Sequence, residues 1–342
     1  MAMNKYLKWL SETNTYWWND DADMDTMDIA IDNGSTGVTT NPLLVKKSLY
    51  AHPDYWRPNI AGAKDLTGDA KAEEIIRGIT VQIAKKYQPI YEKSGGVQGY
   101  VCAQVNPKKQ GDTAEMIEIG LRLAAWAPNI AVKVPATAAG IRAIEELQAQ
   151  GLTTVGTVSF TVSQALAIAA AQQRGLTRCR KAGIKSGKAF SVIMVGRLDD
   201  YLRDVVHDMG SSVPEEHIIC AGTACIKRAY KIAREAGYET KLMPAGMRGA
   251  YHATDLAGSD MSFSLSAGIH VMLGKVEELV EMEDYEIPAE IIESLMSIPE
   301  FKRAYEPNGL PVSEFITYGV TQRTLSQFVE AGWTPISEFE IG

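Results

Sequence analysis

The sequence is poor in cysteine, has no long apolar run and carries no excess of basic residues. Four cysteines among 342 residues are too few to staple a chain of this size, so a disulfide-built fold is excluded and reduced thiols are expected. The first residues, MAMNKYLKWLSETNTYWW, lack the apolar core of a signal peptide, and no stretch of about eighteen uncharged apolar residues occurs. We therefore expect a cytoplasmic protein that has no membrane partner.

Charge and motif spacing exclude further classes of ligand. Lys and Arg number 34 against 42 Asp and Glu, a net charge of −8, and no basic run offsets this balance locally, so nucleic acid is not an expected partner. No G-x-G-x-x-G or P-loop spacing follows a strand-like run, which disfavours nucleotide and flavin enzymes. His217, Cys220 and Cys225 match no established zinc spacing, so neither a metal nor another cofactor is predicted.

What the sequence does have is a regular alternation of short β-rich runs and longer helical stretches. Its content of 46% hydrophobic and 22% charged residues is typical of a soluble globular protein. We interpret eight runs as strands, at residues 16–20, 36–40, 99–105, 130–136, 154–159, 190–195, 239–245 and 260–263. This alternation predicts an α/β protein built as a single parallel (β/α)₈ TIM barrel. An open doubly wound sheet is the alternative, because periodicity does not prove closure.

Amphipathic stretches between the strands predict helices at 70–94, 113–126, 140–150, 162–174, 199–209, 223–236 and 249–256. Residues 264–342 follow the eighth strand, contain helical patterns at 288–298 and 321–331, and are not set apart by a polar linker. We therefore expect one domain over residues 1–342, in which 264–342 form a helical C-terminal extension packed on the barrel. The segment 46–67 contains prolines and aromatics, and it predicts an irregular loop over one barrel end.

A lysine interrupts an apolar strand in the segment NIAVKVPATAAGIRAIEELQ. Side chains alternate between the faces of a strand, so Val132 and Val134 point one way and Lys133 the other. If the valines meet the surrounding helices, Lys133 faces the barrel interior. Burial disfavours the charged ammonium and yields the neutral amine that attacks a carbonyl. The alternative is a solvent-facing lysine on an edge strand, which is less common where a run is buried on both faces.

Several segments, taken in order and with their spacing, resemble one enzyme family. They are TGVTTNPLL, AVKVPATAAGIRAIEELQAQG, TVGTVSFTVSQAL, VGRLDDY and AGYETKLMPAGMRG. Over roughly residues 17–263 the chain is similar to the transaldolases, including their short branch, the fructose-6-phosphate aldolases. The resemblance implies a Schiff base on Lys133, a sugar phosphate substrate and a place in the pentose phosphate pathway. The sequence does not determine the oligomeric state, and a homo-oligomer is one of the alternatives.

The resemblance also implies roles for other residues. Asp20 matches the aspartate that shuttles protons, with a helix cap as its structural alternative. Thr157 matches the threonine that holds a relay water. Asn41 matches the residue that binds the dihydroxyacetone part of the substrate, although Asn before proline also suits a turn. Arg197 and Arg248 match the residues that bind the substrate phosphate, and solvated surface arginines are the alternative.

Some positions depart from the transaldolase pattern. Gln104 stands where transaldolases have a glutamate in the water relay, as in the aldolase branch, and an amide cannot take a proton. Met194 matches neither branch, and Val155 and Val192 replace polar substrate contacts. We therefore expect either transfer of dihydroxyacetone to an aldose acceptor or its release as a free product. A non-catalytic sugar-phosphate-binding barrel is the alternative of another class, but retention of the catalytic set argues against it.

Overall fold

The computed structural model describes residues 4–342 and contains one parallel sheet of eight strands. The strands are β1 (Tyr16–Asp20), β2 (Gly37–Thr39), β3 (Tyr100–Gln104), β4 (Ile130–Pro135), β5 (Thr154–Thr157), β6 (Ala189–Ile193), β7 (Lys241–Pro244) and β8 (Ser262–Leu265). Their order is β7-β6-β5-β4-β3-β2-β1-β8, and β7 and β8 contact each other. The ring is therefore nearly closed, and the predicted (β/α)₈ barrel is confirmed over the open sheet.

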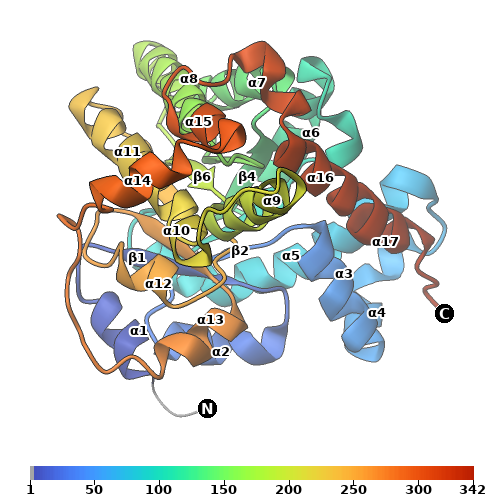
Figure 1. Cartoon of the computed structure of the whole chain (residues 1–342). Coiled ribbons are helices and arrows are strands. Elements are labelled where there is room, and N and C mark those ends of the chain that lie inside the picture. Colours follow the sequence, from blue (N-terminus) through green and yellow to red (C-terminus); the bar gives the residue numbers. More distant parts are fainter. Residues whose placement is uncertain (1–3) are drawn as a thin grey trace.

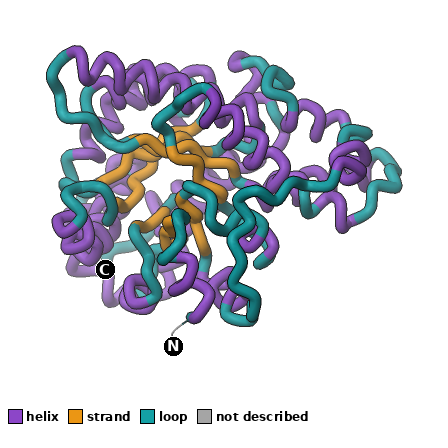
Figure 2. Tube along the Cα trace, turned by 90° about the vertical axis from the view of Figure 1, so that its left-hand side faces the viewer, coloured by secondary structure: helices purple, strands orange, loops and turns teal. Residues whose placement is uncertain are grey.

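Helices surround the strands on the outside of the ring (Figures 1 and 2). They are α1 (Lys5–Leu10), α2 (Met24–Asp32), α3 (Pro42–Ala51), α4 (Pro53–Ile60), α5 (Gly68–Lys93), α6 (Thr113–Ala124), α7 (Ala138–Ala149), α8 (Val162–Lys181), α9 (Val195–Asp208), α10 (Glu215–Ile218), α11 (Ala221–Glu235), α12 (Tyr251–Thr254), α13 (Ala267–Leu273), α14 (Ala289–Leu295), α15 (Pro299–Tyr305), α16 (Gly319–Gln327) and α17 (Thr334–Glu338). A π-helical turn, η4 (Phe328–Trp333), joins α16 to α17. None of the helices in residues 4–342 is long and apolar enough to span a membrane.

The segment that we expected to be an irregular loop, 46–67, is largely helical. It contains the end of α3 and all of α4. Pro42 and Pro53 lie in the first turns of these helices, where a missing N–H costs nothing. Leu49, Trp56 and Ile60 are fully buried. Pro53 therefore marks a helix start and Trp56 a core contact, although Pro58 lies inside α4. The prediction of a loop was wrong.

Capping residues start the helices that follow the strands of the site. Thr137 caps α7 by accepting from the Gly140 N–H, and Thr161 forms a reciprocal capping box with Gln164 at the start of α8. Gly140 lies so close to the end of β4 that an added Cβ would be 1.9 Å from the Pro135 carbonyl oxygen. These local signals hold the helices tightly against the carboxyl ends of their strands.

Aromatic side chains fill the barrel interior near the amino ends of the strands. Trp18 of β1 stacks on Tyr100 of β3, with 6.5 Å between ring centroids, and meets Phe190 of β6 edge-on at 4.9 Å. Tyr100 is the first residue of β3, Phe190 is the second of β6, and Trp18 is in the middle of β1, so the aromatic layer lies toward the amino ends. Polar interior residues come later along the strands, at the carboxyl end where TIM-barrel active sites lie. The aromatic layer thus forms the floor of the candidate site.

The residues after β8 cover one side of the barrel. Helices α14 and α15 contact α11, α16 contacts α9, η4 contacts α3, and α17 contacts α5. Figure 1 shows α16 and α17 beside α3, far from it in sequence. Because β8 ends at Leu265, this extension begins slightly later than the sequence indicated.

Candidate active site

Lys133 lies inside the barrel, on β4 between Gln104 of β3 and Val155 of β5. Its side chain is buried, with the residue only 6% exposed, and Nζ donates a hydrogen bond to the Thr40 carbonyl oxygen at 3.3 Å. Among residues 4–342 it forms no ion pair within 4.0 Å. A buried amine with a single neutral partner is costly to keep. Lys133 is thus an interior lysine and not the solvent-facing residue of an edge strand.

Asp20 ends β1 and belongs to a small hydroxyl network. Its carboxylate accepts a hydrogen bond from Thr39 Oγ1 at 2.7 Å, and Thr39 Oγ1 lies 2.7 Å from Ser264 Oγ. The N-cap of the next helix is Asp23, and Asp21 accepts two backbone N–H groups of the intervening turn. Burial raises the pKa of Asp21. Capping therefore falls to its neighbours, and Asp20 keeps its carboxylate at the strand ends.

Thr39 and Ser264 were not identified from the sequence. One signal was present for Ser264, because the run MSFSLS alternates serine with apolar residues, which is typical of a strand whose serines share one face. Thr39 lies in the motif TTNP, in which only Asn41 was assigned a role from the sequence. Both hydroxyls border the carboxyl group of Asp20 and are able to donate and accept hydrogen bonds.

Gln104 and Thr157 end strands β3 and β5, on either side of β4. Gln104 is 5% exposed, and its Oε1 has no hydrogen-bond partner within residues 4–342. Thr157 is buried, and the next residue, Val158, has φ 52°. A β-branched residue rarely takes this left-handed conformation, which costs about 1–3 kcal/mol. The strain turns the chain immediately after Thr157 and so fixes where β5 ends.

Asn41 is the N-cap of α3. Its Oδ1 accepts from the N–H groups of Leu43 at 2.9 Å and Leu44 at 3.1 Å. Asn41 thus caps a helix, a role that differs from the turn considered as its alternative. Capping uses only the amide oxygen, and the amide N–H groups are the donors that a ligand would meet.

Arg197 and Arg248 lie beside each other at the ends of β6 and β7. An added Cβ on Gly196 would be 2.7 Å from Arg248 Cγ. Arg197 Nη1 donates to Gln327 Oε1 at 2.7 Å, whereas Arg248 forms an ion pair with Asp200 at 2.7 Å. Burial, and then the Arg248 charge, lower the pKa of Arg197. Arg197 forms no ion pair within 4.0 Å in the described chain. Its charge is thus available to an anion.

A buried pair of titratable residues contacts the backbone of Arg248. His252 Nε2 lies 2.7 Å from Asp199 Oδ2, and both side chains are 0% exposed. The backbone N–H of Arg248 donates to His252 Nδ1 at 3.2 Å. Because Nδ1 accepts this hydrogen bond, the ring proton lies on Nε2, which donates to Asp199. Burial raises the pKa of Asp199. This pair, which the sequence analysis missed, fixes the loop that carries Arg248.

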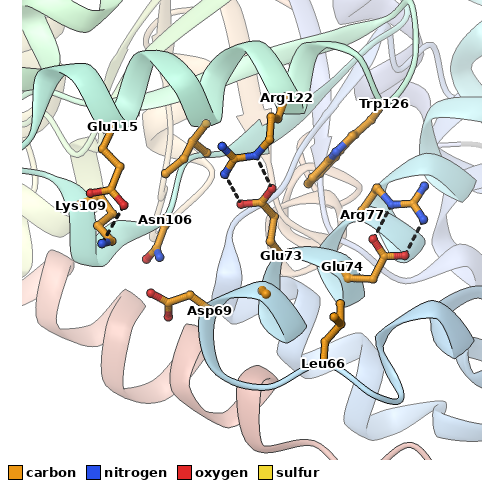
Figure 3. A pocket seen from close by; sticks show the side chains of 12 residues that line it. Leu66, Asp69, Glu73, Glu74, Arg77, Asn106, Lys109, Glu115, Arg122 and Trp126 are labelled. Atoms are coloured by element: carbon orange, nitrogen blue, oxygen red, sulfur yellow. Dashed lines mark hydrogen bonds and ion pairs between the residues drawn. The ribbon is translucent and has the colours of Figure 1, made fainter.

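A separate hollow of about 430 Å³ lies outside the barrel, between α5 and α6 (Figure 3). Its charged side chains pair with one another: Glu73 with Arg122, Glu74 with Arg77, and Lys109 with Glu115. Because these charges neutralise each other and the hollow lies in the outer helical layer, we do not assign a ligand to it.

Potential metal ligands come together at one place in the described chain. Asp23, Asp25 and His52 lie close enough to share an ion. Asp23 already pairs with His52 at 3.1 Å and accepts from the Asp25 N–H. His217 and its two neighbouring cysteines, which we considered from the sequence, do not form such a group in residues 4–342.

Comparison with known proteins identifies the family. The sequence profile of Transaldolase/Fructose-6-phosphate aldolase matches residues 17–288. The chain belongs to this family. It is 27% identical over 308 residues to a transaldolase of Thiobacillus denitrificans, covering 84% of this chain and 82% of that one. It is 30% identical over 250 residues to transaldolases of Mycobacterium marinum and Mycobacterium tuberculosis, covering 68% of this chain and 66% of theirs. The protein is therefore an enzyme with a transaldolase-type or aldolase function.

Proposed function

We propose that the protein transfers a dihydroxyacetone unit from a ketose phosphate to an aldose acceptor through a Schiff base on Lys133. The observation that carries this proposal is the placement of the Lys133 amine. It is buried beside strand ends that present an acid, two hydroxyls and an amide, and its one hydrogen bond within residues 4–342 goes to a backbone carbonyl. An amine in such a desolvated setting is a nucleophile for a carbonyl.

The reaction then proceeds in balanced steps. Lys133 Nζ adds to the ketose carbonyl, and the carbinolamine loses water to give the imine. Asp20 takes the proton of the substrate hydroxyl, the adjacent carbon–carbon bond breaks, and its electron pair passes into the imine to form an enamine. The aldose fragment leaves as an aldehyde. The enamine attacks a second aldehyde, whose oxygen takes the proton from Asp20, and water then releases the new ketose from Lys133.

Other residues serve proton transfer and binding in this proposal. Gln104 and Thr157 hold a water between Asp20 and the imine, which the free amide oxygen of Gln104 supports. Asn41 donates its amide N–H groups to the dihydroxyacetone part. Arg197 and Arg248 bind the phosphate at the far end of the sugar, since guanidinium groups form charge-assisted hydrogen bonds to phosphate oxygens.

A second candidate is release of dihydroxyacetone as a free product. Two observations favour it. Gln104, the neighbour of Lys133 on β3, is an amide and not a carboxylic acid, so Asp20 is the single acid/base in the set. Val155, the neighbour on β5, is fully buried and apolar. The wall beside the amine therefore offers an acceptor aldehyde no hydrogen bond on that side.

Borohydride reduction across a panel of ketose phosphates and their unphosphorylated counterparts tests the proposal. We expect a stable adduct of the ketose fragment on Lys133, located by peptide mass analysis, and none in Lys133→Met. Lys231→Met is the matched control, because Lys231 is an exposed lysine of α11. Turnover that requires an added aldehyde supports transfer, and free dihydroxyacetone from donor alone supports release. An adduct on another lysine, or ketose binding without any adduct, refutes the Schiff-base proposal.

A further inference from the structure

The C-terminal extension supplies side chains to the anionic end of the site. Gln327, the last residue of α16, accepts the hydrogen bond from Arg197 Nη1 at 2.7 Å. The next residue, Phe328, is 1% exposed, and its ring centroid lies 5.9 Å from the centre of the Arg197 guanidinium. Arg197 itself follows β6, so the two halves of this contact are 130 residues apart in sequence.

Several contacts fix the extension over the strand ends independently of Arg197. Gly332 of η4 lies against the start of α3, where an added Cβ would be 2.8 Å from Pro42 Cβ. Trp333 Nε1 donates to Asp69 Oδ1 at 2.9 Å, and Asp69 also pairs with Lys108 at 2.9 Å. Figure 3 shows Asp69 at the edge of the hollow, beside the C-terminal helices.

A further contact joins α16 to the segment after β5, where Gln164 Nε2 donates to Thr321 Oγ1 at 3.3 Å. Together these contacts tie the extension to the segments that follow β2 and β5, and α16 also contacts α9, which follows β6. The turn that they hold is a π-helix, a conformation that is frequent at functional sites. The side chain of Gln327 is therefore presented to Arg197 by a fixed backbone.

We propose that Gln327 positions Arg197 for the anionic group of the substrate and thereby sets the preference for phosphorylated sugars. A neutral amide oxygen orients the guanidinium without cancelling its charge, whereas Arg248 nearby is already paired with Asp200. A carboxylate in the same place would form an ion pair with Arg197 and compete with the substrate. This inference rests on the proposed function for the reaction, but the anion-binding part is measurable without turnover.

The test compares Gln327→Glu with Gln322→Glu by titrating each purified protein with inorganic phosphate in a calorimeter. Gln322 is an exposed residue of the same helix, so the control makes the same change of charge away from Arg197. We expect the Kd for phosphate to rise about tenfold or more in Gln327→Glu, the scale of one charge-assisted hydrogen bond, and to stay at the wild-type value in Gln322→Glu. Gln327→Ala should give an intermediate rise, because it loses the orienting acceptor without adding a charge.

Turnover gives a second readout. The ratio of kcat/KM for a phosphorylated ketose to that for its unphosphorylated counterpart should fall about tenfold in Gln327→Glu relative to Gln322→Glu. Equal phosphate affinity in these two variants, or a wild-type protein that binds no phosphate, overturns the inference. If borohydride traps no adduct while the two variants still differ in phosphate affinity, the proposed reaction fails and the role of Gln327 stands. Urea unfolding of each variant confirms that the comparison is made on folded protein.

Discussion

Replacing Lys133 by Met should abolish catalysis and at the same time stabilise the fold. The substitution keeps an unbranched side chain that is one heavy atom shorter, and it removes the amine of a residue that is 6% exposed. In the part of the chain that the structure describes, the amine has one hydrogen bond, of 3.3 Å, to the Thr40 carbonyl oxygen. A functional role for Lys133 predicts that the residue lowers the stability of the fold, because it is retained for its chemistry.

The size of the effect follows from three contributions. Removing a poorly satisfied buried polar group relieves about 1–3 kcal/mol. Packing the methyl group of Met in its place adds about 0.8 kcal/mol of apolar burial. Loss of the weak hydrogen bond to Thr40 reduces this gain in stability by about 0.5–1.5 kcal/mol. We therefore expect the free energy of unfolding to rise by about 0.3–3 kcal/mol, with a central value near 2 kcal/mol.

Urea unfolding at neutral pH, followed by circular dichroism, measures this difference directly. Lys231→Met provides the comparison and should change the free energy of unfolding by no more than about 0.5 kcal/mol, as is usual for surface positions. Borohydride trapping on the same samples reports the catalytic loss. If Lys133→Met lowered the stability of the protein by more than about 1 kcal/mol, the amine would be a structural element of the core and the reasoning would be wrong.

Three further predictions follow from the site and its surroundings. Gln104→Glu should retain adduct formation but add an acidic limb to the pH–rate profile, because a second carboxyl near Asp20 raises one of the two pKa values; an unchanged profile would place Gln104 outside the proton relay. Arg248→Ala should raise KM for a phosphorylated substrate by a factor equivalent to about 1.5–3 kcal/mol, and steady-state kinetics that show no rise would remove it from the anion site. Burial lowers the pKa of His270 to about 4. The neutral imidazole therefore contributes fully to the stability of the fold above the usual histidine pKa near 6.5, and the free energy of unfolding decreases by about 3 kcal/mol as the pH falls through 4. His270→Phe should reduce this acid-induced loss when urea unfolding is compared between neutral pH and about pH 4, and an unaltered acid slope would contradict it.

The sequence determined much of the fold through signals of short range. The alternation of strand and helix patterns predicted the barrel, and the alternation of faces within β4 placed Lys133 in the interior. Caps such as Thr137 and Thr161 act within three residues along the chain, which is why they can be recognised locally. Local reading failed at 46–67, because a proline such as Pro53 has the same appearance at a helix start as in a loop. Only the burial of neighbouring side chains such as Trp56 distinguishes the two cases.

The tertiary structure decided which residues surround the predicted ones. Thr39 meets Ser264 across 225 residues of chain, His252 meets Asp199 across 53, and Arg197 meets Gln327 across 130. Periodicity has a range of a few residues and carries no information on such pairs. They exist because the ring places β1 between β2 and β8, and because packing of the extension on α3 and α9 brings α16 to the strand ends. The sequence alone thus identified the strands and the amine, whereas closure and packing determined the hydroxyls, the buried pair and the amide that surround the site.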